Sequence, residues 1–117
     1  MIIVTNHVRN SNGREYEKEM RFNGFEDLFK WMVEWWNSPS VQMCSFYEPN
    51  DSDVCHLFSF GLGKERISVA MVRDEATNDI YYSDGSLTRG QKHLSDKLLP
   101  YIEKARKEME KPVYRFI

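Results

Sequence analysis

The chain contains few cysteines, no long apolar run and no excess of charge of one sign. Only two of its 117 residues are cysteines, Cys44 and Cys55, too few for a domain held together by a disulfide framework. The apolar opening, residues 1–4, is shorter than an export signal or a membrane span. The net charge of -2 lacks the cationic excess that sequence-independent nucleic-acid binding requires. We therefore expect a cytoplasmic protein with reduced thiols that binds neither nucleic acid nor membranes.

The chain also lacks a recognisable arrangement of catalytic or metal-binding residues. Cys55 and His56 are adjacent, but neighbouring side chains on a strand point to opposite faces and cannot pair as nucleophile and base. His7 and His93 do not have the spacing of metal ligands. The stretch 61–64, Gly-Leu-Gly-Lys, lacks the rest of the phosphate-binding loop pattern and leads into a strand. We expect no catalytic residue, no metal and no cofactor, and a structural role for both cysteines.

The apolar content is sufficient for one folded core. Hydrophobic residues make up 41% of the chain and aromatic residues 14%. A chain of this length buries roughly two-thirds of its extended surface on folding, so it needs neither disulfides nor a metal. No linker, repeat or low-complexity segment interrupts the sequence. We expect a single domain that spans residues 1–117.

Two segments have the apolar spacing of amphipathic helices. In residues 25–36 the apolar side chains cover an arc of about 200°, and charged residues fill the remainder. Asn23 followed by Glu26 resembles a capping box at the start of this helix. Apolar residues recur at helical spacing again near the end of the chain, where a proline is accepted in the first turn. The second helix is therefore expected at about residues 100–109.

Period-two alternation and turn residues predict antiparallel strands. Asn12-Gly13 favours a tight hairpin turn between the first two strands, and Gly61 and Gly63 bracket a second turn. Residues 66–72 are apolar on both faces, which predicts a central strand. The expected fold class is α+β, a single twisted antiparallel sheet with two helices. The expected strands lie at residues 2–4, 16–22, 41–47, 54–60, 66–72, 80–82 and 113–117.

Acidic residues gather in two of the expected loops. One loop contains Glu48, Asp51 and Asp53, and the other carboxylates, including Asp79 and Asp84, flank the expected strand 80–82. These residues have two interpretations at this point. They are either solvated turns or a negative surface that complements a basic partner and speeds association with it.

The middle of the chain resembles the central signature of a family of bacterial immunity proteins that are paired with polymorphic toxins. The signature is a strand, then Gly-Leu-Gly-x-Glu, here residues 61–65, then an apolar strand. Family members continue with a short aromatic strand, here residues 80–82, and a Leu-x-Pro helix opening, here residues 98–100. A proline-containing terminal strand follows, here residues 111–114. The resemblance covers roughly residues 54–117.

The resemblance implies a cytoplasmic antitoxin that binds one toxin domain and blocks its active site without catalytic residues of its own. If the toxin is a nuclease, its basic cleft would be complemented by the acidic loops. Two other interpretations stay open: a small enzyme or ligand-binding domain with an apolar pocket, and a mobile-element inhibitor of another host protein. The residues nominated for toxin binding are Glu48, Asp51, Asp53, Asp79, Tyr81 and Asp84.

Overall fold

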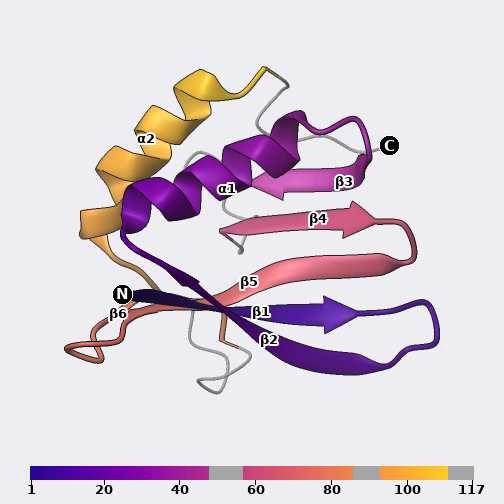
Figure 1. The fold of residues 1–117 in the computed structure, drawn as a ribbon, viewed down its shortest axis with the longest axis horizontal. Coiled ribbons are helices and arrows are strands. Elements are labelled where there is room, and N and C mark those ends of the chain that lie inside the picture. The colour runs from indigo at the N-terminus through magenta and orange to yellow at the C-terminus, as the bar shows by residue number, and fades with distance from the viewer. Residues whose placement is uncertain (48–56, 86–92, 111–117) are drawn as a thin grey trace.

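The computed structural model describes residues 1–47, 57–85 and 93–110. Within these residues, antiparallel strands form one sheet, and two helices lie together on one of its faces (Figure 1). The α+β class with a single antiparallel sheet is thereby confirmed. The elements in chain order are β1 (Ile2–Arg9), β2 (Glu15–Phe22), α1 (Phe25–Asn37), β3 (Val41–Phe46), β4 (Phe58–Leu62), β5 (Glu65–Asp74), β6 (Ile80–Ser83), β7 (His93–Leu94), a 3-10 turn (Asp96–Leu98) and α2 (Leu99–Glu108).

The sheet has the strand order β2-β1-β5-β4-β3 and divides at β5. One side of β5 pairs with β1 over most of its length. On its other side, residues 65–68 pair with β4 and residues 71–73 pair with β6, which in turn pairs with β7. The Leu57 backbone N–H donates to the Tyr82 hydroxyl at 3.0 Å, which joins the two branches. The sequence predicts a central strand where both faces are apolar, and this strand is β5, which forms hydrogen bonds with three other strands.

The hydrophobic core lies between the helices and the sheet. Helix α1 buries Leu28, Met32 and Trp36, which are spaced four residues apart and so share one face. Trp35 stacks on Phe60 of β4, with ring centroids 5.0 Å apart and an angle of 17° between the planes. Full burial of a large apolar side chain contributes about 1.5–3 kcal/mol. This packing fixes α1 against β3 and β4.

The β4–β5 hairpin needs its two glycines for different reasons. Gly63 has a φ of +61° at the first position of the two-residue turn, as a type II′ turn requires. Gly61 lies within β4, where a Cβ atom would approach the Gln42 carbonyl oxygen to 3.0 Å. Gly63 therefore permits the turn, and Gly61 permits β3 to pack closely beside β4. The structure has the hairpin turn that the sequence predicts in this stretch, but Gly61 belongs to β4 and the turn consists of residues 63 and 64.

Two local expectations differ from the structure. The first hairpin has a longer turn than the two-residue turn expected at Asn12-Gly13: the Asn10 N–H donates to the Arg14 carbonyl, and Gly13 has a φ of +79°. This is a type I turn followed by a glycine bulge. The capping box is also wrong, because the residue at the N-cap of α1 is Gly24, which has no side chain to cap the first turn. The expected terminal strand, residues 113–117, lies outside the described residues.

Candidate functional site

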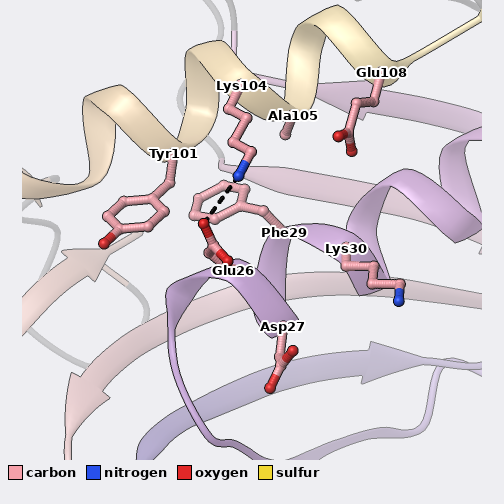
Figure 2. A pocket seen from close by; sticks show the side chains of 8 residues that line it. All are labelled: Glu26, Asp27, Phe29, Lys30, Tyr101, Lys104, Ala105 and Glu108. Carbon is pink, nitrogen blue, oxygen red and sulfur yellow. Dashed lines mark hydrogen bonds and ion pairs between the residues drawn. The ribbon is translucent and has the colours of Figure 1, made fainter.

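A groove lies between α1 and α2 (Figure 2). Its volume is about 390 Å³. Phe29 and Ala105 form an apolar floor and are each only 3% exposed, and the half-buried ring of Tyr101 lies beside them. Phe29 and Tyr101 are nearly parallel, with centroids 6.5 Å apart. The remaining lining residues are charged: Glu26, Asp27, Lys30, Lys104 and Glu108.

An ion pair connects the two helices across this groove. The Lys104 Nζ atom lies 2.9 Å from the Glu26 Oε1 atom, as the dashed line in Figure 2 shows. The hydrogen bond to Glu26, and then the charge of that carboxylate, raise the pKa of Lys104. Both side chains are more than half exposed, so solvent screens the pair and its contribution to stability is small. It orients Lys104 over the groove.

The far end of the groove is held by hydrogen bonds. The Asn37 side chain donates to the Glu108 carbonyl at 3.3 Å and accepts from the Glu110 N–H at 3.0 Å. The C-terminal ends of α1 and α2 are thereby tied together, and the groove keeps its width. An apolar floor with a charged rim suits a side chain or a small molecule that carries both apolar and polar groups. Within the described ranges, no cluster of three histidine, cysteine or acidic side chains could hold a metal.

Three of the six residues nominated from the sequence are described. Asp79 is exposed and ends the turn after β5, where its carbonyl accepts from the Asp74 N–H at 2.9 Å. Asp84 is half-buried and lies at the other end of β6, where its N–H donates to the Ala70 carbonyl. Strand β6 separates the two aspartates by roughly 16 Å of extended chain. Glu48, Asp51 and Asp53 lie outside the described residues.

Tyr81 lies mainly in the core. It is 9% exposed, and its ring meets Phe25 edge-on, with centroids 4.9 Å apart. The Lys97 ammonium group lies 5.9 Å from the centre of the same ring. Tyr81 therefore supports the start of α1 and offers little surface to a partner. Neighbouring residues of a strand face opposite sides of the sheet, so strand alternation predicts burial of only one of Tyr81 and Tyr82. In β6 both tyrosines are buried.

The turn that contains Asp79 is stabilised by its own polar groups. The Asp74 carboxylate accepts from the Ala76 N–H at 2.9 Å, and Glu75 lies 3.5 Å from Arg21. Asn78 adopts a φ of +60°, a conformation that asparagine tolerates better than most residues. Several of the turn carboxylates therefore have a structural role. Asp79 is the nominated residue whose described surroundings leave it most exposed.

A second row of carboxylates escaped the sequence analysis. Glu15, Glu17 and Glu19 alternate along β2, and all three are exposed. Phe22, in the same strand, contacts Trp31 of α1, so the residues at odd positions face away from the helices. The Glu-x-Glu-x-Glu spacing was the available signal.

Comparisons of the chain with protein-family models, with curated proteins and with solved structures give no match. Neither of the described helices combines the length and the apolar content that crossing a membrane requires. Of the two cysteines, Cys44 is completely buried in β3, as expected, and Cys55 lies outside the described residues. Functional inference therefore depends on the residues and their arrangement.

Proposed function

We propose that this protein is an immunity protein that binds a toxin domain and blocks its active site. The observation that carries the proposal is the position of the family signature in the fold. Residues 61–65 span the end of β4, the two-residue turn and the first residue of β5, and β5 is the strand to which β1, β4 and β6 all pair. A signature at the centre of the sheet describes a shared architecture and leaves the surface free to differ with each partner.

Exposed carboxylates favour a partner whose surface is basic. Asp79 projects from the turn before β6, and Glu15, Glu17 and Glu19 form a row on β2. Complementary charges increase the association rate and suppress wrong partners more than they increase affinity. A protein that must capture a newly delivered toxin benefits most from that kinetic effect. The toxin class that fits is a domain with a cationic active-site cleft, as in a nuclease.

The test is co-expression with the toxin domain encoded beside the gene for this chain. We expect the chain to restore growth, and to bind an inactive form of the toxin domain as a discrete complex in size-exclusion chromatography. The matched control is an unrelated toxin domain of similar net charge, which should remain toxic. A folded chain that neither binds nor protects would refute the proposal.

A ligand-binding domain is the second candidate, and the groove between α1 and α2 is the observation that favours it. Its volume of about 390 Å³ is near the lower end of the range for small-molecule sites. A thermal-shift screen with small amphipathic compounds would separate the two candidates. A compound that stabilises the wild-type chain but not a Tyr101→Ala variant, together with no binding of the toxin domain, would favour the groove.

A further inference from the structure

Within the part of the chain that the structure describes, strand β2 is an uncovered edge of the sheet. It has eight residues and is outermost in the strand order, and among the described residues it pairs with β1 alone. In Figure 1 its first half lies at the lower border of the sheet, away from α1 and α2. An outer strand presents unpaired N–H and C=O groups to which another strand can bond. The question is which residues of β2 present these groups.

The turn between β1 and β2 determines which residues of β2 point their N–H and C=O groups outward. The Asn10 N–H donates to the Arg14 carbonyl, so these two residues form a hydrogen-bonded pair. Hydrogen-bonded and non-hydrogen-bonded pairs alternate along an antiparallel ladder. The next pair, Arg9 with Glu15, is therefore non-hydrogen-bonded, and so is every second pair after it. The residues of β2 whose N–H and C=O groups point outward are Glu15, Glu17, Glu19 and Arg21.

The outward-bonding residues are thus the same residues whose side chains lie on the face of the sheet that points away from α1 and α2, the helix-free face. Three consecutive members of this row are glutamates, about 7 Å apart along the strand. Glu15 already lies 3.1 Å from Arg9, and Glu19 lies 3.9 Å from Arg73, but both contacts are exposed ion pairs of small energy. Among the described residues Glu17, at the centre, has no ion-pair partner. A strand added beside residues 15–19 would meet a carboxylate at each bonded position.

A second copy of the chain complements this edge only in part. Two β2 strands would pair antiparallel through their outward-bonding residues. In one of the two longest registers, Glu15 would lie opposite Arg21 of the other copy, but Glu17 would lie opposite Glu19. In the other register, Glu17 would lie opposite Arg21, but Glu19 would lie opposite itself. Like charges directly opposite each other destabilise a strand pair, whereas an extended segment with cationic side chains at alternate positions would place a cation opposite each of the three glutamates.

We propose that β2 is a docking edge for a strand of the toxin domain that carries lysine or arginine at every second residue. This inference rests on the proposed function for the identity of the partner, but the edge can be tested without any toxin. The partner strand would bond the backbone of Glu15, Glu17 and Glu19, and its cations would lie opposite their carboxylates on the helix-free face. Cross-strand pairs of opposite charge each contribute roughly 0.2–1 kcal/mol.

The probe is the capped peptide Thr-Lys-Thr-Lys-Thr-Lys-Thr, with a matched peptide in which glutamate replaces lysine. Amide chemical shifts of the labelled full chain are followed during titration with each peptide. We expect saturable shifts at Glu15, Glu17 and Glu19 with the lysine peptide only, and a weaker response at high salt. Shifts that spread over unrelated surfaces, or equal shifts with both peptides, would overturn the proposal.

Two proline variants separate backbone pairing from general charge attraction. Glu17→Pro removes an outward N–H, and an edge strand accepts proline at such a position. It should fold, retain the β1–β2 pairing and lose most of the peptide response. Lys18→Pro is the matched control, because it removes an N–H that bonds β1, and it should lower the thermal midpoint clearly. If Glu17→Pro does not fold, Glu17→Lys serves instead and should reduce peptide affinity several-fold.

The toxin assay then distinguishes the two proposals. Loss of both peptide binding and protection in Glu17→Pro supports the docking edge. Full protection by a Glu17→Pro chain overturns it as the toxin site and leaves the immunity function standing. Peptide binding at β2 by a chain that protects against no toxin supports the edge and refutes the proposed function. A dimer of the wild-type chain that Glu17→Pro converts to monomer overturns the proposal in favour of self-pairing.

Discussion

Replacement of Asn6 by leucine should stabilise the protein. Asn6 lies in β1 and is only 2% exposed. Its side-chain oxygen has no hydrogen-bond partner among the described residues, and its amide nitrogen donates to the sulfur of Met20 at 3.3 Å, a weak acceptor. Leaving a buried acceptor unsatisfied costs about 1–3 kcal/mol. Leucine has nearly the same shape and carries no polar atom, so the cost disappears without a new cavity.

The magnitude follows from these terms. The recovered penalty is partly offset by the lost contact with Met20, so we expect the free energy of unfolding to rise by about 1–2 kcal/mol. For a chain of this size that corresponds to an increase in Tm of roughly 4–8 °C. Urea unfolding followed by circular dichroism measures it, and the denaturant slope should stay unchanged.

The matched control is Asn6→Asp, which keeps the shape and adds a charge. Burial disfavours the ionised carboxyl and raises its pKa in the folded state. The stability deficit should therefore be largest at neutral pH and shrink as the pH falls towards the unfolded-state value of about 4. An Asn6→Leu chain that is less stable than wild type would refute the reasoning, because it would mean that the Asn6 oxygen is satisfied, for example by a buried water.

Three further predictions concern single side chains. The hydrogen bond from the Tyr16 hydroxyl to Glu65, 3.1 Å long, raises the pKa of Tyr16. Ultraviolet titration of the wild-type chain should therefore show a tyrosine with a pKa above 10.0, and Glu65→Gln should lower the pKa of that tyrosine. Cys44→Ala should lower the free energy of unfolding by about 1–2 kcal/mol and leave toxin protection intact, whereas loss of protection by a folded variant would restore a functional role for the thiol. Asp79→Lys should slow association with a basic toxin domain a few-fold and flatten its salt dependence, measured by stopped-flow fluorescence, while an unchanged rate would leave Asp79 a solvated turn residue.

Local patterns were sufficient to predict most elements of the fold. The apolar arc of residues 25–36 corresponds to α1 at Phe25–Asn37, because helical periodicity and burial against a sheet are the same requirement. Pro100 lies in the first turn of α2, where its missing N–H has no cost. Strand β5 is central because both of its faces are apolar. Each of these signals is carried by residues close together in the sequence.

The remaining features depend on residues far apart in the chain. The groove is lined by residues of both helices, such as Glu26 and Lys104, and neither segment contains a sign of the other. The burial of Tyr81 follows from its contact with Phe25, which is also far away in the sequence. The edge position of β2 depends on the strand order, and no local pattern of Glu15–Glu19 shows which strand is outermost. The nominated acidic residues were therefore chosen only by their positions in expected loops and beside an expected strand.

The division of the sheet at β5 has a consequence for how the fold opens and forms. Strands β4 and β6 bond different segments of β5, so the amides of β6 can exchange with solvent without disrupting the β4–β5 hairpin. The hairpin is also the most local pairing of the sheet's centre, whereas β1 reaches β5 across more than half of the chain. Pairings that close short loops form early. The Gly61–Glu65 turn is thus placed to nucleate folding, and the slowest amide exchange should be found in β5 beside it.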